Sequence, residues 1–195
     1  HHPHLETLPM QFGTKDIADD RAILEKMSGY IVRGMSYPFG TYNDDVINSM
    51  RAGGMEYSRT VGSTNAFSIP KDFMVWNPTC HHNADLLGLL EKFHSISWID
   101  LPLFYIWGHS YEFDRDNNWN KIEEFCEKAS GNEDVWYATN IELVDYINAL
   151  KQIRFSWDRR LAYNPTITDV WVQVNNEAVK IGAGQTVDLG EEATK

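Results

Sequence analysis

Histidines are the residues of this chain best suited to proton transfer and metal binding. The chain has seven of them, at positions 1, 2, 4, 81, 82, 94 and 109. An imidazole titrates near neutral pH, so it can act as an acid or a base, and the neutral ring binds zinc-type cations. His94 lies at the end of an expected helix, where a charged ring favours the helix dipole, and we interpret it as structural. The other histidines make acid–base or metal-assisted chemistry the first hypothesis.

Three short motifs follow one another in a fixed order. They are His2-Pro3-His4-Leu5, Met35 to Asn43, and Tyr105-Ile106-Trp107-Gly108-His109. In this order they resemble the polysaccharide deacetylase family, the NodB-type carbohydrate esterases. The stretch from Tyr105 to Asp114, with Asn118-Trp119 after it, is the most specific and resembles a bacterial subgroup of that family. The resemblance covers about residues 1–150, and it implies that the chain starts after the family's first acidic motif and within its second.

The resemblance implies a divalent metal, usually zinc, bound by one Asp and a His-x-x-x-His pair. The second His of that pair is followed by Pro, as His2 is here, so His2 is the expected metal ligand. A cation with imidazole and carboxylate ligands lowers the pKa of a bound water towards neutrality. The alternative is that residues 1–4 are a disordered end or the remnant of a tag.

Two residues are expected to be catalytic. His109 follows an apolar strand, and the carboxyl end of a barrel strand faces the usual active-site mouth. The resemblance implies that it protonates the leaving amine, and the alternative is a structural His bonded to a loop. The family's Arg-x-Pro-Tyr-Gly motif aligns on Pro38, which places Ser36 where the family has its Arg. We expect Arg59 to supply that charge, although it is equally suited to bonding a loop carbonyl.

Four residues are expected to contact substrate: Tyr37, Trp76, His81 and Trp107. The resemblance implies an oxyanion donor at the backbone N–H of Tyr37 or of a neighbour. Aromatic rings stack on the apolar faces of sugars, but they fill protein cores more often. Neighbouring side chains on an extended segment point in opposite directions, so His81 and His82 are not expected to bind one metal ion.

Alternating strands and helices predict an α/β fold. With the resemblance, the expected fold is a partial, distorted (β/α)7-type barrel lacking its first strands over residues 1–150, followed by an antiparallel β-rich extension over 151–195. The helices are expected at 16–27, 44–52, 85–93, 117–129 and 141–150, and the first strands at 30–36, 56–61, 103–107 and 135–138. A long loop is expected over 62–83, with a brief extended piece at 73–76. The later strands are expected at 153–157, 161–163, 170–174, 179–181 and 186–189. Missing early strands would expose sheet edges, which predicts a possible homodimer.

Composition excludes some classes of partner. The formal net charge of −11 argues against nucleic acid and against an anionic membrane surface. No apolar run is long enough to span a bilayer. Cys80 and Cys126 form no spaced metal motif, and two distant cysteines in such a domain are more often free and buried. The compartment is left open, although members of the family are often extracytoplasmic.

The expected function is metal-dependent hydrolysis that removes acetyl groups from a polysaccharide. Metal-bound water would attack the acetyl group, and His109 would protonate the leaving group. Because the acidic motif precedes this sequence, we expect the chain by itself to be inactive. The alternative is a non-catalytic glycan-binding protein of the same fold, and a third class is an interaction scaffold that recruits a partner through its β-rich end.

Overall fold

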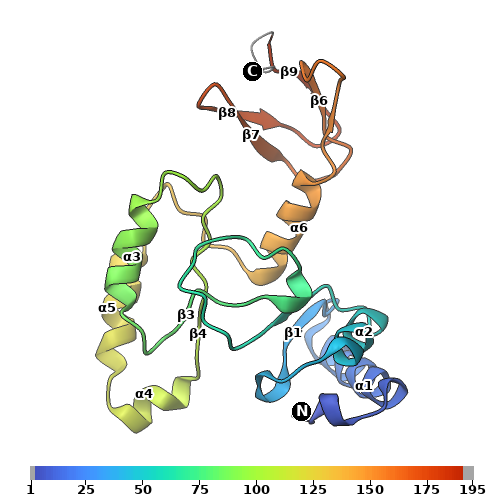
Figure 1. Cartoon of the computed structure of the whole chain (residues 1–195), viewed down its shortest axis with the longest axis vertical. Helices are drawn as coiled ribbons and strands as arrows, with labels where there is room; N and C mark the ends of the chain where they lie inside the picture. Colours follow the sequence, from blue (N-terminus) through green and yellow to red (C-terminus); the bar gives the residue numbers. More distant parts are fainter. Residues whose placement is uncertain (1–2, 191–195) are drawn as a thin grey trace. The chain divides into compact units, whose positions relative to one another are not determined.

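Helices and short strands alternate along the computed structural model, which describes residues 3–190 (Figure 1). The predicted mixed α/β class is confirmed. Within the described residues, the strands form separate sheets of two or three strands, so the barrel is not confirmed. The chain divides into two compact units, and the boundary between them in the sequence lies between Trp136 and Tyr137. The predicted division lay after residue 150.

The first unit begins with two packed helices and a parallel strand pair. After the short 3₁₀ helix η1 (Leu5–Thr7), α1 (Met10–Ser28) packs on α2 (Asp44–Ala52). β1 (Gly34–Ser36) pairs in parallel with β2 (Tyr57–Arg59), and Ser36 lies opposite Arg59. The apolar core between these elements includes Ile17, Val46 and Met50.

A second parallel pair lies further along the chain. β3 (Cys80–His81) pairs with β4 (Ile106–Trp107), and His81 lies opposite Trp107. The short helix α4 (Ser110–Asp116) follows β4, and the helices α3 (Leu86–Ser95) and α5 (Trp119–Ala129) contact each other beside these strands (Figure 1). The core here includes Cys80, Leu86 and Leu89.

One extended segment, residues 76–81, joins the two pairs. After the 3₁₀ helix η3 (Phe73–Val75), the Trp76 N–H donates to the Ser58 carbonyl, and the Thr60 N–H donates to the Trp76 carbonyl. Further on, the Thr79 N–H donates to the Tyr105 carbonyl. The four parallel segments therefore have their carboxyl ends at one edge, which is where polar groups from different segments can meet.

Several element bounds differ from those predicted. α1 begins at Met10, after Pro9, rather than at residue 16, because the apolar spacing continues before Thr14. The strand predicted over 30–36 is three residues long, and residues 73–75 form a 3₁₀ helix. Residues 135–138 contain no strand. Asn43 caps α2 by accepting the Val46 N–H, and Gly29 ends α1 in the left-handed conformation.

The second unit contains α6 (Asn140–Leu150) and the predicted antiparallel strands. β5 (Arg154–Phe155), β6 (Leu161–Tyr163) and β9 (Thr186–Asp188) form one sheet, and β7 (Val170–Val174) and β8 (Glu177–Ile181) form a hairpin. Asn175 and Asn176 both have positive φ, as a two-residue hairpin turn requires. The Thr139–Glu142 capping box of α6 is present as predicted.

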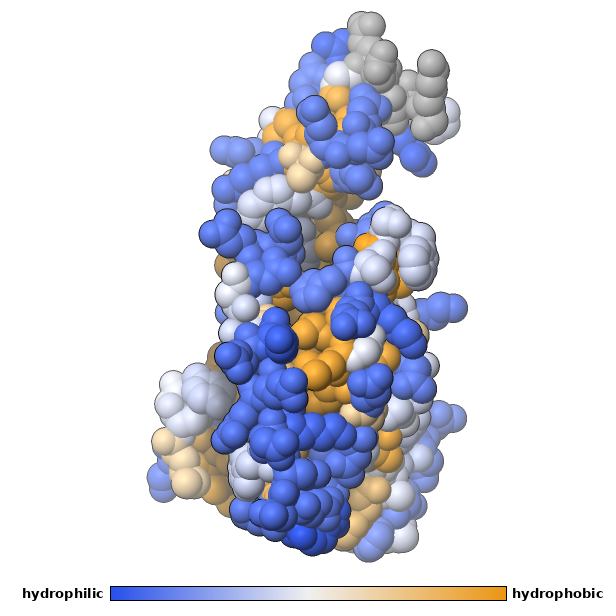
Figure 2. Space-filling model, turned by 90° about the vertical axis from the view of Figure 1, so that its left-hand side faces the viewer, coloured by the Kyte–Doolittle hydropathy of each residue, from blue (hydrophilic) through white to orange (hydrophobic). Residues whose placement is uncertain are grey.

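The face of the molecule drawn in Figure 2 is largely hydrophilic, with hydrophobic surface gathered in patches between the hydrophilic residues. None of the helices in the described part has the length and apolar character that a bilayer crossing requires. Cys80 and Cys126 are both free, but only Cys80 is buried.

Asn164 is expected to be the main polar anchor of the second unit. Its side chain is 0 % exposed, donates to the carbonyls of Thr168 and Ile181, and accepts from the backbone N–H of Thr166. Each buried group left without a partner costs about 1–3 kcal/mol, so Asn164→Ala should lower the free energy of unfolding by at least about 2 kcal/mol. Denaturant unfolding measures this. The exposed Asn148→Ala is the control, and equal stability of the two variants would contradict the assignment.

Candidate functional site

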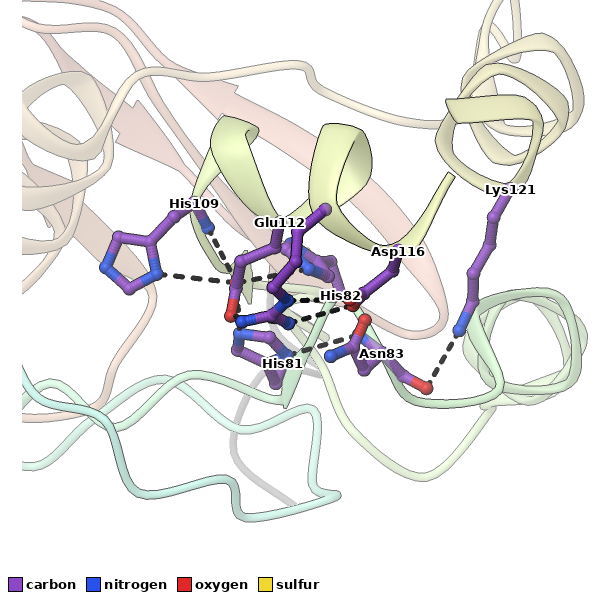
Figure 3. A network of polar contacts seen from close by, with 8 residues as sticks. His81, His82, Asn83, His109, Glu112, Asp116 and Lys121 are labelled. Atoms are coloured by element: carbon purple, nitrogen blue, oxygen red, sulfur yellow. Dashed lines mark hydrogen bonds and ion pairs between the residues drawn. The ribbon is translucent and has the colours of Figure 1, made fainter. Parts of the chain in front are cut away.

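Three histidines meet at the carboxyl edge of the parallel segments. β3 ends at His81, with His82 next to it, and β4 ends two residues before His109, which caps α4. Because His81 lies opposite Trp107 in the ladder, the residues after both strands leave the sheet at the same place. Figure 3 shows Glu112 of α4 between His109 on one side and His81 and His82 on the other.

A single carboxylate oxygen contacts all three rings. Glu112 Oε2 lies 3.1 Å from His81 Nε2, 3.2 Å from His82 Nε2 and 3.4 Å from His109 Nδ1. The Glu112 side chain is 12 % exposed. We refer to these four residues, His81, His82, His109 and Glu112, as the His–Glu cluster.

Helix capping holds Glu112 in place. Its Oε2 accepts the backbone N–H of His109 at 3.2 Å, three residues earlier, which is the reciprocal bond of a capping box. Burial acts to raise the pKa of the Glu112 carboxyl. The pKa nevertheless stays below its usual value, because the carboxylate accepts hydrogen bonds from the N–H and ring of His109 and lies near the charges of His81 and His82. The carboxylate is therefore ionised at neutral pH.

His82 is the buried member of the cluster. Its side chain is 4 % exposed and its ring lies 4.3 Å from that of Phe113. Burial first, and then the neighbouring charge of His81, lower the pKa of His82. Its Nε2 is buried without a hydrogen-bond partner among the described residues, although Glu112 Oε2 is close.

His81 is fixed from its other side. Its Nδ1 lies 3.2 Å from the backbone N–H of Asn83, which makes Nδ1 the acceptor and leaves the proton of the neutral ring on Nε2. The Asn83 carbonyl in turn accepts from Lys121 Nζ at 2.8 Å, which ties this loop to α5 (Figure 3).

Arg59 and Trp107 extend the site towards β2. The Arg59 Cζ lies 4.8 Å from the centroid of the Trp107 ring, and that ring is 4.7 Å from the ring of His81 and 5.9 Å from the ring of His109. Arg59 Nε donates to Ser36 Oγ at 3.2 Å, so Arg59 contacts the residue that aligns with the family's Arg. Arg59 Nη1 also donates to the Thr60 carbonyl, which is the loop hydrogen bond that the sequence offered as the alternative role of Arg59.

Burial lowers the pKa of the Arg59 side chain, and no carboxylate of residues 3–190 forms an ion pair with it. Its charge is therefore available to an anionic group at this edge.

The structure does not bring Tyr37 and Trp76 to this site. The Tyr37 N–H donates to the Arg59 carbonyl in the β ladder, which leaves it no free hydrogen for an oxyanion, and its hydroxyl donates to the Met74 carbonyl. Trp76 is 1 % exposed, and its ring packs on Tyr57 and Phe73. Both side chains are core residues, so neither enters the proposed site.

The two N-terminal motifs meet each other. The His4 ring stacks on Phe39 of the Tyr37-Pro38-Phe39-Gly40 motif with 4.2 Å between the centroids. His2, the expected metal ligand, lies outside the described residues, so its role stays a prediction.

Within the described part of the chain, one set of side chains is arranged as metal ligands would be. The ligating atoms of His81, His109 and Glu112 lie within 4.8 Å of one another. Two imidazoles and a carboxylate form a donor set that suits zinc and related cations. Sequence reasoning missed Glu112 and His82. The spacing of His109 and Glu112, three residues apart after an apolar strand, was the signal for Glu112.

Residues 1–58 match the family model for polysaccharide deacetylase. The N-terminal part of the chain is therefore similar to this family. The predicted resemblance is thus confirmed, and it supports a hydrolase of the deacetylase type. The match ends one residue before Arg59, so the roles of Arg59 and of the His–Glu cluster rest on geometry. No curated protein and no solved structure matches the chain.

Gly108 should be required for this arrangement. A Cβ at this position would lie 1.9 Å from His82 Nδ1, and the ring is enclosed by Phe113 and Glu112. Gly108→Ala should therefore displace His82 and lower the free energy of unfolding by about 1–3 kcal/mol, the usual cost of overpacking. Chemical denaturation measures the loss, and ring resonances of His82 in NMR spectra report the displacement. Unchanged resonances and stability would contradict the packing described.

Proposed function

We propose that this protein removes acetyl groups from a polysaccharide by metal-dependent hydrolysis, with the His–Glu cluster as part of its reaction site. The family match supports the class of reaction, which is hydrolysis of a carbon–nitrogen bond other than a peptide bond. The observation that carries the assignment to this site is the approach of Glu112 to His109 at the carboxyl edge of the parallel segments.

His109 is suited to protonate the leaving group. Its side chain is 49 % exposed, and its Nδ1 lies 3.4 Å from Glu112 Oε2. A carboxylate at one ring nitrogen orients the imidazole and stabilises its protonated form, as in other histidine-based catalytic sites. The opposite nitrogen is then free to donate a proton to a departing amine.

Arg59 and Trp107 are suited to bind the substrate or an anionic group near it. Trp107 presents an indole next to both His81 and His109, and indoles stack on sugar rings. Arg59 stacks on this indole and has no carboxylate partner within the described residues. The pair thus offers one apolar face and one positive charge beside the cluster.

The family resemblance implies a divalent metal with His2 as one ligand. When bound, such an ion polarises a carbonyl group and lowers the pKa of water. The imidazole and carboxylate groups of the cluster are donors that suit the same class of ion.

His109→Ala should lower kcat for acetate release by about 100- to 10,000-fold, because general acid catalysis contributes that much. Acetate release from acetylated oligosaccharides would be measured on the chain and on a protein that includes any residues encoded ahead of His1. His94→Ala, an exposed histidine of α3, is the matched control.

Full activity of His109→Ala would contradict the role of His109. Binding of the oligosaccharide without turnover in any of these proteins would favour the non-catalytic glycan-binding alternative.

Arg59→Gln should lower kcat/KM by about tenfold or more, since a hydrogen bond to a charged group contributes about 1.5–3 kcal/mol. Arg59→Lys should recover part of the loss, because it restores the charge without the planar group that stacks on Trp107. The exposed Arg51→Gln, which breaks only the ion pair with Asp72, is the control. Equal kinetics for Arg59→Gln and Arg51→Gln would contradict a role in binding.

A further inference from the structure

The spacing within the His–Glu cluster matches that of ligands around a metal ion. Ligand atoms at about 2.0–2.2 Å from a tetrahedral zinc ion lie about 3.3 Å from one another. Glu112 Oε2 lies 3.1 Å from His81 Nε2 and 3.4 Å from His109 Nδ1. The two distances from the carboxylate oxygen are thus close to those between zinc ligands, and all three ligating atoms lie within 4.8 Å of one another.

A second, independent observation comes from His82. This ring is almost fully buried, and its Nε2 lies 3.2 Å from the same Glu112 oxygen without a hydrogen-bond partner among the described residues. Buried polar atoms without partners are rare in folded proteins. A cation on Glu112 Oε2 would place positive charge close to the lone pair of this nitrogen, although His82 is not one of the three grouped ligands.

We propose that His81, His109 and Glu112 bind a divalent transition-metal cation of the zinc type, separate from the ion expected at His2. The bound cation would occupy Nδ1 of His109 and so prevent the ring from forming the imidazolium that donates the proton from its other nitrogen. The effect on His109 as a proton donor rests on the proposed function, whereas the binding of the cation does not. The cluster would then act as an inhibitory metal site at high zinc concentrations.

Binding of the cation at His81 would break one hydrogen bond of that ring. In the neutral His81 ring the proton is on Nε2, because Nδ1 accepts from the Asn83 N–H. A cation at Nε2 displaces this proton to Nδ1 and ends the bond from Asn83. The Lys121 contact with the Asn83 carbonyl can persist. The site is therefore expected to bind less tightly than a site whose rings need no rearrangement.

Cobalt(II) titration of the whole chain, followed by visible absorption and calorimetry, tests the binding without any measurement of activity. Glu112→Gln keeps an oxygen that can accept the His109 N–H, so it preserves the cap and removes only the charge. This variant and His109→Ala should each weaken cobalt binding at the cluster at least about tenfold. Glu91→Gln and His94→Ala, both exposed on α3, and His2→Ala should leave that cobalt signal unchanged.

Wild-type cobalt binding in Glu112→Gln, with folding confirmed by circular dichroism, would overturn the site. Loss of the cluster's cobalt signal in His2→Ala would overturn its independence from the expected family metal. Acetate release measured at rising zinc should increase and then fall, and a plateau without a fall would overturn the competition for His109. If no acetate is released at any zinc concentration, the proposed function and the competition fail, while the cobalt titration still decides the binding.

Discussion

The approach of three imidazoles to one partly buried carboxylate is the interaction on which this site depends. A carboxylate removed from water is costly unless hydrogen bonds and positive charge compensate it. At Glu112 the compensation comes from the N–H of His109 and from rings that can each carry a proton. Removing Glu112 would leave the buried His82 ring without its neighbouring carboxylate, so the carboxylate and the rings support each other.

Backbone geometry makes this approach possible. The parallel register places His81 opposite Trp107, and the turn at Gly108 starts α4 directly after β4. A helix of only seven residues then turns Glu112 back towards the sheet edge. The segment 76–81 also pairs with β2, so Arg59 reaches Trp107 from the neighbouring strand. The short parallel segments thus bring together residues as distant in the sequence as Arg59 and Trp107.

Sequence reasoning found most of the members of the site but not the group that joins them. His109 and Arg59 were predicted from their places after expected strands, and His81 and Trp107 were predicted as substrate contacts; all four lie together. Glu112 was missed because a Glu in the first turn of a helix is usually a solvated cap. Trp76 was assigned to substrate because an aromatic side chain gives the same signal in a groove and in a core, and Tyr37 because the resemblance implies an oxyanion donor at its backbone. The α/β class and the antiparallel end follow from periodicity, whereas barrel closure depends on long-range pairing that periodicity does not encode.

Histidine ring nitrogens report most directly on the central claim that Glu112 organises the cluster. Long-range ¹⁵N–¹H spectra of the rings, recorded for the chain with Glu112 and with a neutral isostere at this position, separate the tautomers and their hydrogen bonds. The account predicts that the ring signals of His81, His82 and His109 all change while the signals of His94 stay in place. Ring signals that stay unchanged when the carboxylate is removed, or that change for His109 alone, would contradict the role of Glu112.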